Sequence, residues 1–435
     1  MLLTSTSNPE ARVTWREAVL SGLAPDGGLY VPLTLPRLEQ AELARLRLLP
    51  FPLLCYEIAR AFLGTEVDGE QLKQLCQEAF TFPVPTRPIS ETTSVLELFH
   101  GPTCAFKDFG ARFMARLFKL FWGSDSRRLT VLVATSGDTG SAVANAFFDP
   151  DAFAPIRVCV LFPRGKVSLV QEKQMTTLGG NVSAYEVDGS FDDCQRLVKQ
   201  ALADRSLTGS TALTSANSIN IARLLPQMFY YMHAALHFQG ESRPIVSVPS
   251  GNLGNITGGL LAQMAGAPLG HFIAALNDNS VFAHYLQSGA FCPQPSIETI
   301  SNAMDVGNPS NFARISSLFG GSVDRVRSDV SSFRVSEEDT LQSIRSTYEQ
   351  SGYILDPHTA VGVHALERFR HASQSEAPGL VLGTAHPAKF ADVVRRAIGI
   401  DPELPAQLRA ALEAPGRKEA LANSYAELRG VLVAG

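Results

Sequence analysis

The chain has 435 residues, of which 45% are hydrophobic and 18% charged. This globular composition suits about two or three domains of ~100–200 residues and excludes a disordered or collagen-like chain. The 37 basic and 42 acidic side chains give a net charge of −5 without a long basic run, which argues against bulk nucleic-acid binding. No apolar stretch approaches the ~18 residues of a membrane helix, and the start lacks the pattern of a secretory signal.

Cysteine and histidine usage points to a reduced, cytoplasmic enzyme without a metal. The six cysteines form no CxxC pair, and several lie in apolar segments such as IRVCVLF, which disfavours a disulfide scaffold or a structural zinc site. The nine histidines show no HExxH spacing, and no GxSxG elbow is present. We therefore expect neither a metal site, nor a nucleic-acid partner, nor a membrane partner.

The predicted elements change in kind along the chain. Residues 1 to about 90 are predicted to be mostly helical, with a turn at APDGG. Beyond them, short apolar runs each end in a small-residue loop followed by a helical pattern. The predicted strands are 128–134, 156–162, 244–249, 271–277 and 379–383. Repeated strand–loop–helix units are typical of parallel sheets covered by helices. The polar segment 321–339 is interpreted as a surface loop or an insertion.

One lysine stands out in ELFHGPTCAFKDFGARF, residues 97–113. Lys107 lies between Phe106 and Phe109, and an apolar setting destabilises an ammonium ion and lowers its pKa. Such an amine can act as a nucleophile or form a Schiff base. The alternative is a lysine that reaches the solvent from an amphipathic helix.

Two loops at predicted strand-to-helix junctions could bind anions. In SGNLGN (250–255), glycines allow close approach of the backbone, and free N–H groups at a helix start suit a phosphate. In TSGDTGS (135–141), Ser136 and Thr139 could hold a carboxylate or a phosphate. Ordinary turn chemistry and a helix cap are the respective alternatives. In open α/β sheets ligands bind beyond the carboxyl ends of the strands, where both loops lie.

Further polar residues follow other predicted strands. PRGKVSLVQEK and NSINIAR supply cations and polar groups that could hold a second phosphate, or else form exposed ion pairs: Arg164, Lys166, Ser168, Lys173, Asn217 and Arg223. In GTAHPAKF (383–390), Thr384 could bond a ring nitrogen. His386 and Lys389 are interpreted as solvated neighbours of a strand-end cap.

Together these features suit pyridoxal phosphate, which needs a buried amine, a phosphate cradle and a hydroxyl for its ring nitrogen. HGPTCAFKDFGARF, TSGDTGSA, VPSGNLGN, LGTAHPAKF and SGLAPDGGLYVP also resemble the threonine synthase family, in its longer bacterial and fungal type. The resemblance runs along nearly the whole chain, including SANSINIAR and SNAMDVGNPSN.

The resemblance implies a fold and an activity. The fold is α/β, with two parallel-sheet-containing lobes like those of the tryptophan synthase β subunit (fold type II) and a mostly helical N-terminal extension. The expected divisions are 1–90 for the extension, 91–225 for a smaller lobe with SGDTG, flanked by the cofactor lysine, and 226–435 for a larger lobe with the cofactor phosphate loop. The reaction converts O-phospho-L-homoserine and water to L-threonine and phosphate, the last step of threonine biosynthesis.

The resemblance also assigns roles residue by residue. Lys107 matches the catalytic lysine that binds pyridoxal phosphate as a Schiff base. The cofactor phosphate loop is matched by Gly251, Asn252, Leu253, Gly254 and Asn255. Thr384 matches the hydroxyl that faces the pyridine nitrogen, and Ser136 and Thr139 match the loop that receives the substrate carboxylate. The residues placed near the substrate phosphate are Lys166, Ser168, Asn217 and Arg223.

Two positions depart from related sequences. Cys104 stands where Leu is frequent, which changes packing only. Asp138 stands where shorter relatives have an Asn that bonds the phenolic oxygen of the cofactor, and a carboxylate there would repel that oxygen unless protonated or turned away. We therefore leave Asp138 out of the cofactor site.

Two alternative functions remain open at this point. One is a phospholyase of the same family that releases 2-oxobutyrate, and the other is a non-catalytic paralogue, which would not need a buried amine. The oligomeric state, monomer or dimer, is also left open.

Overall fold

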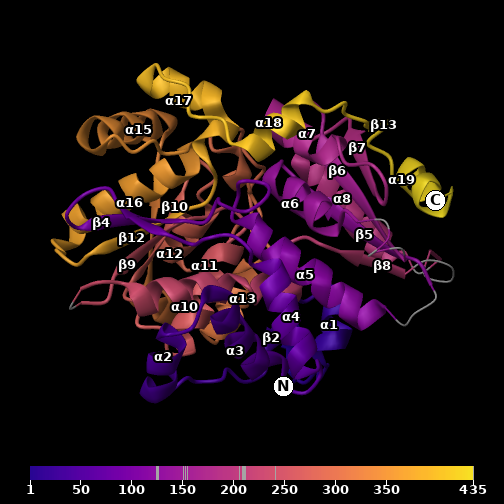
Figure 1. Ribbon diagram of the computed structural model, residues 1–435, viewed down its shortest axis with the longest axis horizontal. Helices are drawn as coiled ribbons and strands as arrows, with labels where there is room; N and C mark the ends of the chain where they lie inside the picture. Colours follow the sequence, from indigo (N-terminus) through magenta and orange to yellow (C-terminus); the bar gives the residue numbers. More distant parts are fainter. Residues whose placement is uncertain are drawn as a thin grey trace.

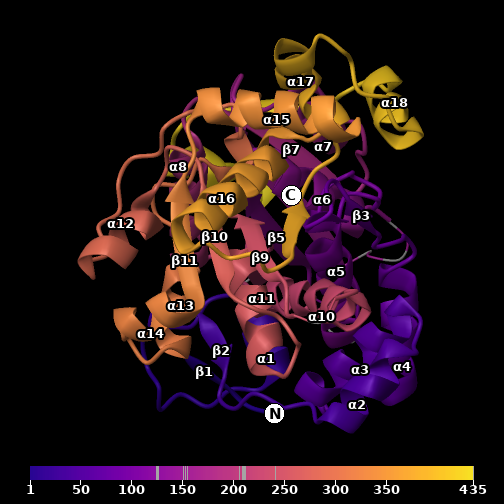
Figure 2. The same ribbon diagram turned by 90° about the vertical axis from the view of Figure 1, so that its left-hand side faces the viewer.

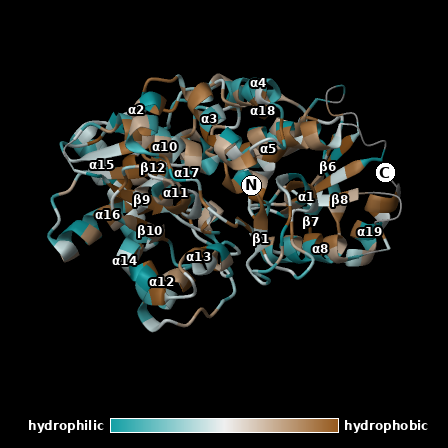
Figure 3. Ribbon diagram, turned by 90° about the horizontal axis from the view of Figure 1, so that it is seen from below, coloured by the Kyte–Doolittle hydropathy of each residue, from teal (hydrophilic) through white to brown (hydrophobic). Residues whose placement is uncertain are grey.

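Two parallel-stranded sheets lie side by side, and the N-terminal helices lie beneath them (Figure 1). The computed structural model describes residues 1–123, 127–149, 151, 153, 155–204, 206–207, 212–240 and 242–434. In the view from below, apolar colour is concentrated on the strands, and hydrophilic colour on outer helices such as α14 (Val323–Asp329) (Figure 3). The sheets therefore form the interior of each lobe.

The larger sheet has six strands in the order β11-β10-β9-β12-β4-β3, all parallel except β3, which runs antiparallel to β4. The strands are β3 (Thr86–Pro88), β4 (Thr93–Glu97), β9 (Ile245–Pro249), β10 (Phe272–Leu276), β11 (Val330–Arg334) and β12 (Gly379–Gly383). In register, Phe272 lies opposite Val246 on one side and Val330 on the other. Strands β9, β10 and β12 are buried at every position, as their continuous apolar runs predict.

The smaller sheet has five parallel strands in the order β13-β7-β6-β5-β8. The strands are β5 (Leu129–Ala134), β6 (Ile156–Pro163), β7 (Val182–Val187), β8 (Ala212–Ser215) and β13 (Glu419–Leu421). Leu129 of β5 lies opposite Ile156 of β6 and Ala212 of β8. The five strands that the sequence predicts in the two sheets are all confirmed.

Helices cover both faces of the sheets, because each parallel crossover needs one. On the larger sheet, α16 packs against the strands from one side with α15 and α17 beyond it, while α11 and α10 lie on the other side (Figures 1 and 2). The helices are α5 (Lys107–Trp122), α6 (Asp138–Phe147), α7 (Leu169–Thr176), α8 (Phe191–Ala203), α9 (Ile221–Leu224), α10 (Gln227–His237), α11 (Gly254–Met264), α12 (Val281–Ser288), α13 (Phe312–Leu318), α14 (Val323–Asp329), α15 (Glu337–Ser351), α16 (Pro357–Ser373), α17 (Ala391–Ile398), α18 (Ala406–Glu413) and α19 (Tyr425–Ala434), with 3-10 turns η1 (Asn302–Met304) and η2 (Pro387–Phe390).

The N-terminal region is mostly helical, as predicted. Its elements are the antiparallel pair β1 (Leu3–Ser5) and β2 (Tyr30–Pro32), and the helices α1 (Trp15–Ser21), α2 (Gln40–Arg47), α3 (Phe51–Leu63) and α4 (Gly69–Ala79). A capping box between Thr14 and Glu17 starts α1. In α3, Leu54, Ile58 and Phe62 recur at helical spacing and are buried. The extension thus joins the main core rather than standing apart.

Three segments differ from the predicted organisation. Strand β4 (Thr93–Glu97), from the range assigned to the smaller lobe, pairs with β12 of the larger sheet. Strand β13 (Glu419–Leu421), from the range assigned to the larger lobe, pairs with β7 of the smaller sheet. Segment 321–339 lies at the surface but is not a loop, because it forms α14 and the edge strand β11. In all three cases pairing between segments distant in sequence decides the placement.

The strand order marks where a ligand can enter. In the larger sheet, the chain passes from β9 to β10 on one side of β9, while β12 lies on its other side. In the smaller sheet, the chain passes from β5 to β6 on one side of β5, while β8 lies on its other side. At such switch points the loops after adjacent strands diverge and leave a crevice beyond their carboxyl ends. None of the described helices is long and apolar enough to cross a membrane.

Candidate active site

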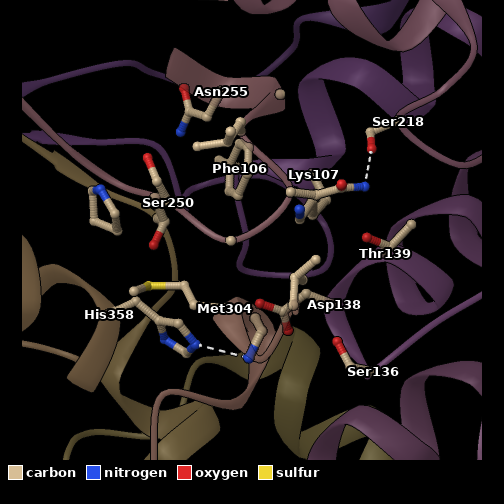
Figure 4. A pocket seen from close by; sticks show the side chains of 18 of the residues that line it. Phe106, Lys107, Ser136, Asp138, Thr139, Ser218, Ser250, Asn255, Met304 and His358 are labelled. Atoms are coloured by element: carbon tan, nitrogen blue, oxygen red, sulfur yellow. Dashed lines mark hydrogen bonds between the residues drawn. The ribbon is translucent and has the colours of Figure 1, made fainter. Parts of the chain in front are cut away.

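One cavity lies where the switch points of the two sheets face each other. The loops that follow β5, β8, β9 and β12 all contribute to its wall, together with the start of α5 (Figure 4). The predicted site residues that line it are Lys107, Ser136, Thr139, Asn217, Arg223, Gly251, Asn252, Leu253, Gly254, Asn255 and Thr384. Lys166 and Ser168 instead line an adjoining cavity, which shares Ser136 and Phe191 with the first.

Lys107 is placed by two segments that run antiparallel. The Phe106 N–H donates to the Thr384 carbonyl at 2.9 Å, and the His386 N–H donates to the Cys104 carbonyl at 3.0 Å. Cys104 has a φ of 56°, in the left-handed region, where the chain turns into α5. These contacts hold the first residue of α5, Lys107, beside Thr384 at the cavity.

The environment of Lys107 makes its ammonium group easier to deprotonate than that of an ordinary lysine. Its side chain is partly accessible, and the surface it exposes faces the cavity. Burial, followed by the positive charge of Arg223, lowers the pKa of Lys107 to about 8, while the carboxylate of Asp138 opposes this shift. The amine lies 4.4 Å from the ring centroid of Phe106. An amine with this pKa can exchange protons near neutral pH.

The loop after β9 is held by the protein on most sides. Leu253 takes the left-handed conformation before α11, with a φ of 57°. A Cβ on Gly251 would lie 2.7 Å from the Cα of Met304, so only glycine permits this approach to η1. The side chain of Asn252 is already engaged, since it donates to the Ser218 hydroxyl at 2.7 Å and accepts from the Ser310 N–H. Backbone N–H groups at the start of α11 remain to bind an anion.

Asn255 presents a donor to the cavity. Its Oδ1 accepts hydrogen bonds from the hydroxyls of Tyr230 and Tyr231, whereas its buried Nδ2 has no partner among the described residues. Buried polar groups are nearly always satisfied, so an unpaired donor at the wall of a cavity indicates a ligand.

The loop after β5 is organised by its backbone and leaves its hydroxyls free. The Thr135 hydroxyl accepts from the N–H groups of Gly137 and Gly140, at 2.9 and 2.8 Å. Ser136 and Thr139 lie at the cavity (Figure 4), and neither hydroxyl bonds to any residue that the structure describes. These two groups are available to a polar ligand.

A buried ion pair lies under this loop. The Lys389 ammonium is 2.9 Å from Asp138 Oδ1, which also accepts from Gln171 Nε2 at 2.9 Å. Burial raises the pKa of Asp138, but the charge and hydrogen bond of Lys389, with that of Gln171, hold it below its ordinary value. The expectation that Lys389 is solvated is wrong, because it is 1% exposed and also donates to the Thr103 carbonyl. Asp138 is ionised and lines the cavity.

The predicted phosphate residues differ in what they can bind. Arg223 is 3% exposed, its Nη1 donates to the Ala216 carbonyl, and its Nε has no partner among the described residues. Asn217 Nδ2 donates to the Ala134 carbonyl at 2.6 Å, and Asn217 Oδ1 accepts from the Ala134 N–H at 3.1 Å. The side chain thus connects the end of β8 to β5. Ser168 caps α7 through Gln171, and Lys166 forms an exposed ion pair with Glu298. Arg223 is therefore the buried cation that faces the cavity.

His358 lines the cavity and was missed by sequence reasoning. Its Nδ1 is 2.8 Å from Asp356, and its Nε2 accepts from the Ala303 N–H at 3.1 Å (Figure 4). Asp356 also caps α16, so an Asp-Pro-His at a helix start was the available signal. No group of three or more metal-binding side chains occurs among the described residues.

The fold and the cavity define a class of protein. Residues 95–385 match the family model of pyridoxal-phosphate-dependent enzymes, a range that includes both loops, Lys107 and Thr384. Residues 3–80 match the threonine synthase N terminus, and residues 359–431 match the threonine synthase C-terminal region.

Relatives along the whole chain specify the family. A threonine synthase of Serratia marcescens is 43% identical over 435 residues, covering 100% of this chain and 99% of the relative. The crystal structure of threonine synthase from Escherichia coli matches with a TM-score of 0.93 at 40% identity, over 100% of both chains. That of pyridoxal-phosphate-bound threonine synthase from Brucella melitensis matches with a TM-score of 0.91 at 34% identity, over 99% and 98%. The chain belongs to the threonine synthase family.

The cavity fits pyridoxal phosphate, the cofactor of this class. The group needs an amine of lowered pKa, an anion cradle, and a hydroxyl for its ring nitrogen. Lys107 supplies the first, and Thr384, 5% exposed at the cavity wall, can supply the last. The unpaired Nδ2 of Asn255 and the tight approach at Gly251 match a phosphate held by the loop.

Proposed function

We propose that this chain converts O-phospho-L-homoserine and water to L-threonine and phosphate, in the cytoplasm. The observation that carries the proposal is the meeting of Lys107, Arg223 and the unpaired donor of Asn255 at one cavity. A poised amine and separate sites for two anionic groups are the requirements of a cofactor phosphate and a phosphorylated substrate.

The cofactor is held by residues of three segments. Lys107 binds it covalently, residues 251–255 hold its phosphate, and Thr384 faces its ring nitrogen. When bound, pyridoxal phosphate supplies an electron-withdrawing ring that stabilises negative charge on the substrate carbons next to the amine. Of the loop residues, Asn255 contributes its side chain, whereas Gly251, Asn252, Leu253 and Gly254 contribute the shape of the backbone.

Lys107 also moves protons once the substrate amine has replaced it. With a pKa of about 8, it accepts a proton from the α carbon and exchanges protons at the β carbon. Phosphate leaves from the γ carbon and water adds at the β carbon. All atoms of the substrate and the water are then found in threonine and phosphate. The neutral hydroxyl of Thr384 withdraws electrons less strongly than an acidic partner would, which favours elimination and addition over transamination.

The substrate lies between Lys107 and the smaller lobe. The free hydroxyls of Ser136 and Thr139 bind its carboxylate, and the buried guanidinium of Arg223 binds its phosphate, since a buried dianion without partners is very costly. Lys166 is 52% exposed in its side chain and exchanges Glu298 for the incoming phosphate. Ser168 and Asn217 support this side through their contacts to α7 and β5.

The experiment is product analysis with the purified, cofactor-loaded chain. O-Phosphohomoserine should yield threonine and phosphate in equal amounts. Formation of 2-oxobutyrate without threonine would show a phospholyase instead, and no turnover together with no covalent cofactor would show a non-catalytic paralogue.

A further inference from the structure

We infer that Tyr230 and Tyr231 are positioning residues, which fix the amide of Asn255 so that its nitrogen, and not its oxygen, faces the cofactor phosphate. The inference rests on the proposed role of residues 251–255. It adds two residues outside that loop, on α10, which do not line the cavity themselves.

The geometry brings both hydroxyls to one oxygen. Tyr230 Oη lies 2.7 Å from Asn255 Oδ1, and Tyr231 Oη lies 2.8 Å from the same atom. Both tyrosines are completely buried, and their rings pack together with centroids 5.0 Å apart. Two donors on one carbonyl oxygen use both of its lone pairs.

The direction of these hydrogen bonds decides which end of the amide is free. If the amide were reversed, its NH2 group would donate to the tyrosines, and their hydroxyl protons would need other acceptors. Within the described part of the chain Tyr231 has no other acceptor, and Tyr230 has only Gln227 Oε1, at 3.4 Å. A buried hydroxyl without an acceptor is costly, so the oxygen of Asn255 faces the tyrosines. The nitrogen is left buried, unpaired and at the cavity wall.

Close packing of two helices makes this contact possible. A Cβ on Gly258 would lie 2.8 Å from the Cβ of Gln227, and one on Gly259 would lie 2.8 Å from Cζ of Tyr231. The pair of glycines in α11 therefore lets α10 approach closely enough for the hydroxyls to reach the first turn of α11. The ring of Phe109 packs on Tyr230 at a centroid distance of 5.1 Å and completes the support.

The consequence is chemical selection for an anion. A donor nitrogen attracts a phosphate oxygen, whereas a freely rotating amide would present its oxygen for part of the time and repel it. The tyrosines should therefore contribute to affinity for the phosphate ester and not to affinity for the pyridine ring or the aldehyde.

The test compares pyridoxal phosphate with pyridoxal, which lacks the phosphate, as ligands of the full chain stripped of cofactor. The double variant Tyr230→Phe/Tyr231→Phe should bind pyridoxal phosphate about tenfold more weakly, while its affinity for pyridoxal stays within about twofold. Each single variant should lose about two- to threefold, because the other tyrosine still holds the amide. Tyr285→Phe is the matched control, since Tyr285 is a buried tyrosine whose hydroxyl makes no hydrogen bond within the described residues, and it should change neither affinity.

The outcomes separate this inference from the proposed loop. The inference is overturned if the double variant binds both ligands as the parent chain does, or if it loses affinity for pyridoxal phosphate and pyridoxal equally. If the double variant does not fold, the single variants are judged by the same two outcomes. Asn255→Ala tests the loop itself and should weaken pyridoxal phosphate selectively. If Asn255→Ala has that effect and the tyrosine variants do not, only the positioning role fails. If Asn255→Ala has no effect, the proposed role of Asn255 fails as well.

Discussion

The loops after β9 and β5 face the same cavity but are built in opposite ways. In the loop after β9, the side chain of Asn252 is fixed by other protein groups and one buried donor, on Asn255, is left free. In the loop after β5, the backbone is fixed through Thr135, and the hydroxyls of Ser136 and Thr139 bond to no described residue. A preformed cradle suits a cofactor that stays, whereas unpartnered hydroxyls suit a substrate that comes and goes.

The largest expected effect lies between the two loops, at Lys107. Lys107→Ala should lower kcat at least about 10³-fold, because it removes both the covalent attachment and the proton carrier. Turnover of O-phosphohomoserine by the cofactor-supplemented variant measures this. Activity within about tenfold of the parent chain would mean that another group moves the protons.

The next effect breaks the support of the loop after β5. Lys389→Met leaves the buried carboxylate of Asp138 without its cation and should lower the free energy of unfolding by about 3–5 kcal/mol. Urea denaturation measures it. Adding Asp138→Asn should restore part of the loss. Lys418→Met, which breaks two more exposed ion pairs, with Glu172 and Glu186, should cost only about 1 kcal/mol. Equal losses at Lys389 and Lys418 would contradict the buried pair.

A pH series tests how charges near the two loops act on one amine. Because the pKa of Lys107 is lowered to about 8, protonation removes the reactive amine as the pH falls below 8. The rate of acetylation of Lys107 in the cofactor-free chain, followed by mass spectrometry, should rise about 100-fold from pH 6 to pH 9 and then level off. Asp138→Asn should shift the midpoint down, since the carboxylate raises this pKa. A midpoint above pH 10 would show a solvated lysine.

A smaller effect separates the roles of the two loops. Ser136→Ala/Thr139→Ala should raise KM for O-phosphohomoserine about tenfold through two lost hydrogen bonds and leave the affinity for pyridoxal phosphate unchanged. Asn255→Ala should weaken the affinity for pyridoxal phosphate and leave KM for O-phosphohomoserine unchanged. The proposed division of roles fails if both variants weaken cofactor and substrate alike.

The smallest effect is expected at the rim. Lys166→Met should raise KM about threefold and change stability by less than about 1 kcal/mol, because the Lys166–Glu298 pair is exposed. Glu298→Gln should lower KM, since it frees the same lysine. Steady-state kinetics at low salt measure both, and a rise of KM in Glu298→Gln would contradict a substrate role for Lys166.

The sequence could predict the parts of the fold that depend on local pattern. Strand β9, as VSVP between turn signals, and β12, as GLVLG, are continuous apolar runs, and burial on both faces produces that pattern. The edge strand β11 was missed because VSSFR is half-polar, and an edge strand is covered on fewer sides. The sheet to which β4 or β13 belongs depends on partners hundreds of residues away, which no local pattern records.

The same limit applies to the site: features that depend on local sequence could be predicted, and contacts between distant segments could not. Glycine-rich loops after strands could be recognised because backbone geometry demands particular residue types there. The burial of Lys389 could not, because its partner Asp138 lies 251 positions earlier and the pair forms only when the lobes are folded together. His358 and the two tyrosines on α10 were missed for the same reason.

The most direct measurement is reduction of the cofactor-loaded chain with borohydride, followed by peptide mapping. We expect one stable cofactor adduct, on the peptide that contains Lys107. An adduct on Lys389, which is buried against the cavity residue Asp138, or the absence of any adduct, would contradict the role of Lys107 as the residue that binds the cofactor.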